Sequence, residues 1–395
     1  MREKRLLEAL SEVEDSFVEE IDDVAISSKD KVHVAVRKTY KKKPWIKWLA
    51  MVGVFVLVLV ISGQHSQQGE LSEKQFSASV RNGAVTLGAG EILFTKNPWR
   101  NTKSEEKYPV YKNLSYVEGA GGAPFYFTHE ELQAMSEAVA EKLGAEITGY
   151  IVEEKSIVDS DVEIRSNIFQ LTAQTEIADI RIYGNGEISI FFHEAVALSN
   201  EYQFSDENTY AEAVKLTQYL TEKYKELLCF EQTEEECAIS YDLTGNRTLF
   251  YSAYNVKSEE ADSLTEYCFH NVSFYGDEHG LMVMHYGDVR LASEYLGDYR
   301  VVSEEEARKR LEEGQYFSIY SELDAIGGGF SDENIRLVEL TYLTGSNCRY
   351  YQPYYCFYVE SESYVEGISN YGLFFVPALT DADLEQFQEE YPLGN

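Results

Sequence analysis

The sequence of 395 residues is poor in cysteine, and this scarcity limits the disulfides and metal sites that the chain can form. Its five cysteines all lie after residue 228, and no C-x-x-C pair occurs, which argues against a structural zinc site. An odd number leaves at least one thiol unpaired within a single chain. Cys229 and Cys237 flank a loop and could form a disulfide. Cys348 and Cys356, if they share one extended strand, would lie ~26 Å apart, which is beyond disulfide reach.

The chain is also short of lysine and arginine beyond its first 47 residues. Residues 1–47 hold 11 of the 34 basic and 10 of the 68 acidic residues, and residues 48–63 hold neither. The remaining residues, with 23 basic and 58 acidic side chains, therefore have a formal net charge of −35, against −34 for the whole chain. Such a surface repels nucleic acid and anionic lipid at long range. We therefore predict no nucleic-acid partner, and we interpret the acids first as a solvated surface suited to an exterior setting.

Familiar catalytic and cofactor motifs are missing. The sequences "HEELQ" at His129 and "HEAVA" at His193 lack the second histidine of H-E-x-x-H, and no G-x-S-x-G, P-loop or Rossmann glycine pattern occurs. The glycine loop "GAGGAP", residues 119–124, lacks the lysine that phosphate binding needs. We assign no catalytic residue and expect neither an enzyme nor a cofactor.

One group of residues is a candidate metal site. Asp277, His279, His285 and Asp288 lie close together in "GDEHGLMVMHYGD" and could gather at one sheet edge. A polar turn followed by a strand histidine explains the same pattern more simply. We favour that interpretation and predict no metal ion.

The strongest positive signal is the apolar segment "WIKWLAMVGVFVLVLVISG", residues 45–63. Nineteen helical residues rise ~28 Å, close to the hydrocarbon thickness of a bilayer. Trp45 and Trp48 suit the membrane interface, and Lys47 can extend to it. The preceding region is too long for a cleaved signal peptide, so we predict a retained signal anchor. Lysines before the segment and none directly after it predict a cytoplasmic N-terminus and an extracellular C-terminal region.

Before that segment, residues 6–21, "LLEALSEVEDSFVEEI", have the spacing of an amphipathic helix. Its polar face is acidic, and alone such a short helix would be marginal in water. We therefore predict that it docks its apolar face on a cytoplasmic protein partner. The predicted partner-binding residues are Leu6, Leu10, Val13, Phe17 and Ile21.

After the segment, single helices alternate with groups of strands, which predicts an α+β fold with a helix on one face of each antiparallel sheet. "THEELQAMSEAVAEKLG" begins with the capping pair Thr128 and Glu131 and ends at Gly144, and Asn185-Gly186 predicts a hairpin. Further helices are expected at 205–228 and 303–316.

The expected organisation has six parts, the last three of which are extracellular modules of one helix followed by an antiparallel meander. They are a cytoplasmic segment (1–44), a transmembrane helix (45–63), a stalk (64–78) and the modules 79–200, 201–298 and 299–395.

Several stretches carry a family resemblance. "LLEALSEVEDSFVEEID", the basic tract, "KKKPWIKWLA" and the apolar segment resemble the N-terminus of uncharacterised single-pass membrane proteins of Gram-positive bacteria, some of them similar to membrane-bound anti-sigma factors. "YPVYKN", "EEARKRLEEGQYF" and "YYQPYYCFYVE…YGLFFVPAL" resemble ectodomains of that group, with PepSY-like and YycI-like modules. The resemblance implies a regulatory protein whose cytoplasmic partner is a sigma factor, although the zinc-binding His/Cys motif of many anti-sigma factors is missing.

Two functions follow from these observations. The first is a single-pass membrane regulator or sensor, in which an acidic extracellular region is coupled to the cytoplasmic helix. The second is a surface-anchored binding protein for glycan or protein, with a passive cytoplasmic tail. The sequence identifies neither the extracellular ligand nor the partner.

Overall fold

The computed structural model describes residues 77–78, 80–81, 84–91, 93–101, 107–116, 126–158, 165–256, 263–318, 329–344, 348–363 and 365–384. The amphipathic segment at 6–21 and the apolar segment at 45–63 lie outside these residues. Within the described part of the chain, no helix has the length and apolar character needed to cross a membrane.

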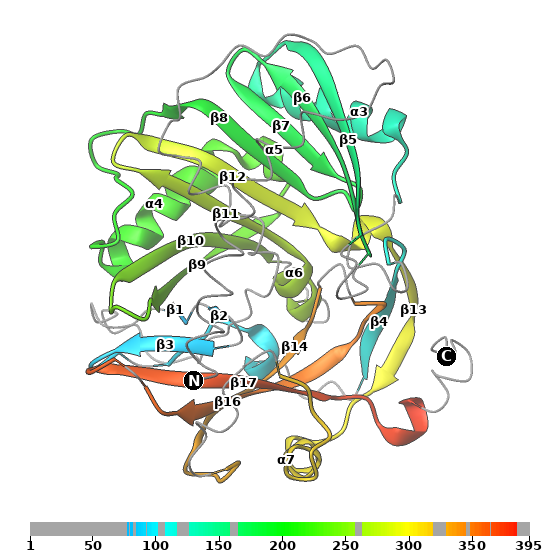
Figure 1. Ribbon diagram of the computed structural model, residues 1–395, viewed down its shortest axis with the longest axis vertical. Helices are drawn as coiled ribbons and strands as arrows, with labels where there is room; N and C mark the ends of the chain where they lie inside the picture. Colours follow the sequence, from blue (N-terminus) through cyan, green and yellow to red (C-terminus); the bar gives the residue numbers. More distant parts are fainter. Residues whose placement is uncertain are drawn as a thin grey trace. The chain divides into compact units, whose positions relative to one another are not determined.

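Most strands belong to one strongly curved sheet that forms a half-barrel (Figure 1). In spatial order its strands are β1 (Ser77–Ala78), β9 (Gln232–Tyr241), β10 (Arg247–Val256), β11 (His270–Asp277), β12 (Gly280–Asp288), β8 (Ile188–Val196), β7 (Ala178–Tyr183), β6 (Arg165–Thr175) and β5 (Ile147–Val158). Neighbours are antiparallel, except that β1 runs parallel to β9.

Two smaller antiparallel sheets complete the described fold. The five-stranded sheet has the order β14 (Ile335–Tyr342), β16 (Pro353–Ser361), β17 (Ile368–Pro377), β3 (Ala84–Gly88) and β2 (Val80–Arg81). The three-stranded sheet has the order β13 (Ser293–Arg300), β4 (Lys107–Asn113) and β15 (Tyr350–Tyr351). The expected α+β class with antiparallel sheets is therefore confirmed.

Helices cover defined parts of these sheets. They are α3 (His129–Leu143), α4 (Tyr210–Lys223), α5 (Lys225–Leu228), α6 (Ser263–Phe269) and α7 (Glu304–Glu312), with short 3-10 turns η1 (Pro98–Asn101) and η3 (Val289–Ala292). Helix α3 packs on β6 and β7, and α4 on β9 and β10. Helix α6 contacts β10 and β11 of the large sheet and β14 of the five-stranded sheet.

Local sequence signals explain where the helices begin and end. The backbone N–H of Thr128 donates to Glu131 at 2.7 Å, and the N–H of Glu131 donates to the Thr128 hydroxyl, which confirms the predicted capping box. Gly144 adopts φ 69°, the left-handed conformation that glycine tolerates best. The second helix begins at its own capping box, Thr209 with Glu212, several residues later than the expected residue 205.

The predicted hairpin at Asn185-Gly186 joins β7 to β8. Gly186 has φ 89°, and the Tyr183 N–H donates to the Glu187 carbonyl at 2.9 Å. The five cysteines are free thiols, with Cys229 exposed and Cys237 buried, so the disulfide considered between these two is absent. Burial raises the pKa of the Cys237 thiol to about 12 and makes it a poor nucleophile at neutral pH.

Strand pairing crosses the expected boundaries at residues 200 and 298. β8 pairs with β12, which makes one sheet out of strands from the ranges 79–200 and 201–298. β3 and β4 fall in the first range, yet they pair with β17 and β13. The three ranges therefore share sheets, because strands from the first range pair with strands from later ranges.

Candidate functional site

A polar row runs across the large sheet. Directly opposed residues of paired strands point to the same face, so the register of successive pairs defines a line of side chains. From β6 to β9 this polar row consists of Thr172, Arg181, Ser189, His285, Ser273, Ser252 and Glu236. Neighbouring strands are ~4.8 Å apart, so the seven residues extend over ~29 Å.

The next row, one residue along each strand, is apolar and faces the opposite side. The apolar row consists of Ala173, Ile180, Ile190, Met284, Phe274, Tyr251 and Cys237. All seven are buried. Helix α4 covers this face near Cys237, where the Thr217 hydroxyl lies 3.5 Å from the thiol. The large sheet therefore has an apolar face beneath helices and a polar face on its other side.

Ser189 and His285 form the centre of the polar row. The Ser189 Oγ lies 2.8 Å from the His285 Nδ1, and Ser189 is buried. Burial lowers the pKa of His285, so the imidazole is neutral near pH 7. A hydroxyl beside an imidazole can serve nucleophilic catalysis when a third group orients the base. Among the described residues no carboxylate hydrogen-bonds to this ring, so we interpret the pair as a hydrogen bond that joins β8 to β12, with the imidazole partly exposed.

Arg181 lies next to Ser189 in the row. Its guanidinium carbon is 4.7 Å from the centre of the Phe191 ring, a cation–π contact. Its Nε is buried, and no described residue accepts a hydrogen bond from it. The nearby Asp179 is engaged by His193, whose Nε2 lies 3.3 Å from the Asp179 Oδ1. Among the described residues, the contact that positions Arg181 is therefore the one with the Phe191 ring.

At its other end the polar row meets the five-stranded sheet. The Tyr267 hydroxyl on α6 donates to the Glu236 carboxylate at 2.9 Å. On β14, Glu339 accepts hydrogen bonds from the Tyr358 hydroxyl at 3.2 Å and from the Thr95 hydroxyl. Both glutamates are buried. Helix α6 contacts strands of both sheets, and its Cys268 thiol lies 3.8 Å from the Thr341 hydroxyl of β14.

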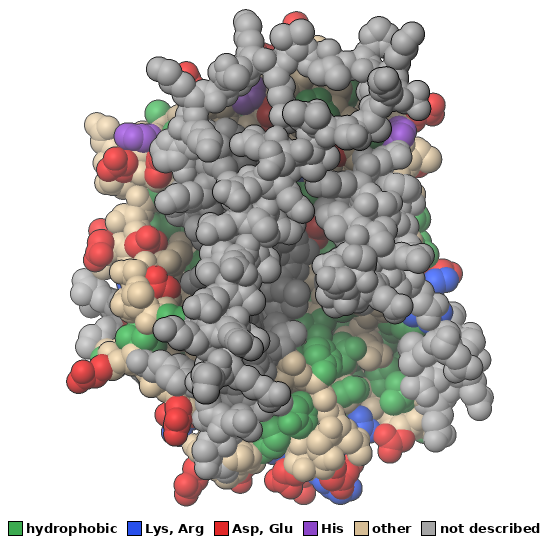
Figure 2. All heavy atoms as spheres, viewed as in Figure 1, with side chains coloured by type: hydrophobic (Ala, Val, Ile, Leu, Met, Phe, Trp, Pro, Cys, Tyr) green, Lys and Arg blue, Asp and Glu red, His purple; other side chains and the backbone are tan. Residues whose placement is uncertain are grey.

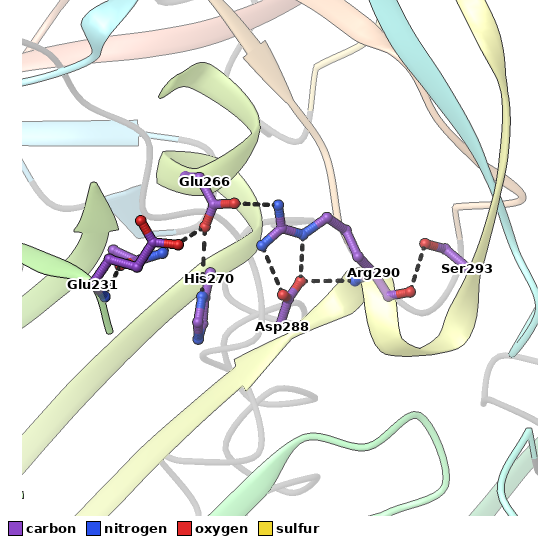
Figure 3. Close-up of polar contacts among 7 residues, drawn as sticks. Glu231, Glu266, His270, Asp288, Arg290 and Ser293 are labelled. Atoms are coloured by element: carbon purple, nitrogen blue, oxygen red, sulfur yellow. Dashed lines mark hydrogen bonds and ion pairs between the residues drawn. The ribbon is translucent and has the colours of Figure 1, made fainter. Parts of the chain in front are cut away.

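A second polar cluster fixes the corner where β12 ends. Glu266 of α6 is fully buried and pairs with Arg290, which also binds Asp288 at 2.7 Å (Figure 3). The Asn255 amide donates to Glu266 at 2.8 Å, and His270 Nδ1 lies 3.5 Å from the same carboxylate. Buried charges need such partners, so we assign this network to positioning α6 against β12 rather than to ligand binding.

The four candidate metal residues do not converge. Asp277 pairs with Gly280 at the turn of the β11–β12 hairpin, whereas Asp288 pairs with His270 at the other end of that hairpin. Asp277 accepts a hydrogen bond from the His279 backbone N–H in the turn, and Asp288 binds Arg290. Only His285 belongs to the polar row. In the described ranges, no group of three or more potential ligands is placed to hold a metal ion.

The other predicted site residues cannot be compared with the structure. The partner-binding residues Leu6, Leu10, Val13, Phe17 and Ile21 and the membrane-anchor residues Trp45, Lys47 and Trp48 lie outside the described residues. Sequence reasoning found the hairpin "ADIRIYGNGEISIFF" but missed Arg181 and Ser189 within it. Their alternation with isoleucines was the available signal, and only the pairing with β12 shows that they join His285.

Acidic side chains are frequent along the outline of the face shown in Figure 2, and few basic ones lie beside them. No protein-family model matches the chain, and no curated protein matches it. A crystal structure of an uncharacterized protein from Mycobacterium tuberculosis is similar at 10% identity and a TM-score of 0.12, over 71% of this chain and 99% of that chain. So weak a likeness carries no argument about fold or function.

Proposed function

We propose that this chain is a single-pass membrane regulator whose extracellular α+β region senses a ligand and is coupled to the cytoplasmic segment 1–44. The proposal keeps the expected order of amphipathic helix, transmembrane helix at 45–63, stalk, and three helix-plus-meander modules. In the element order α3, α4 and α7 each precede a group of strands, and the pairing of β8 with β12 and of β3 with β17 joins the three modules through shared sheets.

The observation that carries the proposal is the path of the chain at the end of the expected stalk, 64–78. Its last two residues form β1, which adds to β9 at the edge of the large sheet. Only a few residues later, β3 adds to β17 of the five-stranded sheet, and β2 adds to β3 as the edge strand. If the two sheets move relative to each other, the movement therefore acts directly on the segment that leads to the predicted membrane anchor.

The polar row gives the ligand a place to act. Thr172, Ser189, Ser273, Ser252 and Glu236 are buried, whereas Arg181 and His285 are partly exposed. A polar ligand that accepts hydrogen bonds would therefore meet the row at the guanidinium and the imidazole. Its far end, Glu236, is hydrogen-bonded to α6, which also contacts the five-stranded sheet. Ligand binding along the row would favour one arrangement of the sheets over another, as any differential affinity does.

At the cytoplasmic end, the helix at 6–21 engages the protein partner, for which the family resemblance suggests a sigma factor. Phe17→Ala is expected to weaken partner binding by ~2–4 kcal/mol, as loss of a central aromatic anchor does. Glu14→Ala, off the apolar face, is the matched control and should cost under ~1 kcal/mol. Both changes in affinity are measured by titrating a labelled 1–28 peptide against the protein that the 1–44 fragment retrieves from lysate. Equal losses of affinity would contradict a docked helix.

The alternative is a surface-anchored binding protein for glycan or protein, in which the polar row binds its ligand without any signal. A disulfide between Ser77→Cys and Ala238→Cys, which face each other in register, separates the two functions. The experiment uses cells that carry the full chain with Cys229→Ser. If the chain is a regulator, the amount of cytoplasmic partner bound to it should differ between the disulfide-locked state and the reduced state. An unchanged amount of partner in both states would favour passive anchoring, and Ser77→Cys alone is the control.

Topology is tested separately. Protease added to protoplasts should digest residues 64–395 and spare an N-terminal epitope tag, because the lysines precede the apolar segment. Protection of a C-terminal tag would contradict the proposed orientation.

A further inference from the structure

The two ends of the large sheet differ. At one end β1 contributes only two residues, whereas at the other end β5 has twelve and is the longest described strand. β5 pairs with β6 along its length, and no described strand lies on its outer side. Natural sheets usually shorten, bend or cover an edge strand, because its unpaired N–H and C=O groups attract other strands. A long open edge therefore marks a surface at which another strand can add.

Three successive large apolar side chains on β5 are exposed. Tyr150 is 38% exposed, Ile151 43% and Val152 46%. Pairing with Thr172 places Ile151 on the polar face, whereas Tyr150 and Val152 lie on the face that carries α3. A free edge strand would gain by burying one face, so apolar exposure on both faces indicates a contact surface.

A groove of about 370 Å³ lies beside this strand, between β5 and α3. Its lining residues are Gln133, Glu137, Ala140, Glu141, Ala145, Ile147 and Tyr150. The small side chains Ala140 and Ala145 leave room at its base, and the Tyr150 hydroxyl donates to Glu137 at 3.1 Å. An edge strand facing a helix across a groove is the geometry that binds peptides by strand addition, with alternate side chains entering the groove.

The charge of the groove selects its occupant. Glu137 and Glu141 line it, and both are exposed. The nearest basic residue in the sequence, Lys142, points elsewhere, because its Nζ lies 3.3 Å from the Cys229 thiol. The groove therefore presents uncompensated negative charge among its lining residues, which complements a positively charged segment.

We propose that the outer edge of β5 and the α3 groove bind an extended segment of a partner protein that carries lysine or arginine at alternate positions. The backbone of that segment continues the sheet along residues 147–153, and its basic side chains reach Glu137 and Glu141. A second copy of this chain is the poorer occupant, since its β5 sequence has Glu153 and Glu154. The proposal goes beyond the sensor function, because a partner can add to β5 whether or not a signal crosses the membrane.

The test begins with a random eight-residue peptide library displayed on phage and panned against the detergent-solubilised full chain. Enrichment of lysine or arginine at alternate positions is expected. The enriched peptide is then labelled and titrated by fluorescence anisotropy. Glu137→Lys with Glu141→Lys should weaken binding at least tenfold, and these exposed helix residues should not affect folding. The control with the same charge change is Glu130→Lys with Glu194→Lys, also exposed but outside the groove, and should change binding less than threefold.

Hydrogen exchange supplies the readout for strand addition. The bound peptide should slow exchange of amides within 147–153, and Ile151→Lys should weaken binding without unfolding the chain. Equal losses in the groove and control variants would overturn the proposal, as would binding that leaves these amides unprotected. Absence of any enriched peptide would also overturn it. Self-association that Ile151→Lys abolishes would instead assign the edge to a second copy.

Discussion

The two faces of the large sheet use the same backbone for opposite purposes. The apolar row beneath α3 and α4 is buried against helices, and most of its side chains contribute by volume and shape, with the Tyr251 hydroxyl hydrogen-bonded to Ser205. The polar row one residue away consists of hydroxyl, imidazole, guanidinium and carboxylate groups, each of which needs a partner. Because side chains alternate along a strand, every strand from β6 to β9 contributes to both rows. The comparison shows that apolar and polar side chains are divided between the two faces of one sheet.

The largest expected loss of stability comes from opening a cavity in the apolar row. Phe274 is 1% exposed, and Phe274→Ala should lower the free energy of unfolding by about 3–5 kcal/mol, through lost burial and the cavity left behind. Urea denaturation of the purified chain, followed by near-ultraviolet circular dichroism, measures it. A loss below about 1 kcal/mol would mean that the face beneath the helices is loosely packed.

The next effect tests how much the free energy of unfolding depends on the ion pair of a buried carboxylate. Arg290→Ala leaves the buried Glu266 without its cation, and we expect a loss of about 2–4 kcal/mol, with Arg290 itself about a fifth exposed. The matched control is Arg336→Ala, which breaks an exposed pair with Glu360 and should cost under about 1 kcal/mol. Equal losses in the two variants would show that Glu266 retains adequate partners without Arg290.

A smaller effect concerns pH and the centre of the polar row. Burial lowers the pKa of His285 in the folded chain, so the unfolded chain binds the proton more readily as pH falls through about 6.5. Stability contributed by neutral His285 is therefore present above that pH and is lost below it, with a slope of at most about 1.4 kcal/mol per pH unit. His285→Gln should flatten the dependence of the unfolding free energy on pH between pH 7.5 and 5.5, measured by urea denaturation. A slope equal to that of the unsubstituted chain would contradict a buried neutral imidazole.

The smallest effects separate two serines of the same row. Ser189→Ala removes the hydrogen bond to His285 and should cost about 1 kcal/mol. Ser252 is 3% exposed, and its Oγ has no hydrogen-bond partner among the described residues. Ser252→Ala should therefore be neutral or stabilising by up to about 1 kcal/mol. The same denaturation measurement applies, and a reversed order of the two variants would show that Ser252, rather than Ser189, is the satisfied hydroxyl.

Local features of this fold were predictable from the sequence, because short-range chemistry determines them. Thr128 with Glu131, Gly144, and the turn at Asn185-Gly186 each act within a few residues, and all three were found as predicted. The α+β class followed from the same alternation of helices and strands.

The polar row was not predictable, because it depends on register between strands far apart in the sequence. Ser189 and His285 become neighbours only through the pairing of β8 with β12, which no local signal specifies. For the same reason His285 entered the sequence analysis as a candidate metal ligand beside Asp277 and Asp288. The predictions for residues 6–21 and 45–63 lie outside the described residues and stay predictions.

The pairing of β3 with β17 also has a consequence for the order of folding. Ala84 lies opposite Gly372, so an early strand finds its neighbour almost 290 residues later in the sequence. During synthesis, which delivers the chain from its N-terminus, residues 84–88 must wait until residues 368–372 arrive. Pairing over so long a separation is intrinsically slow. The five-stranded sheet therefore closes last, and a nascent chain arrested before Ile368 should present β3 as an unpaired strand to chaperones and proteases.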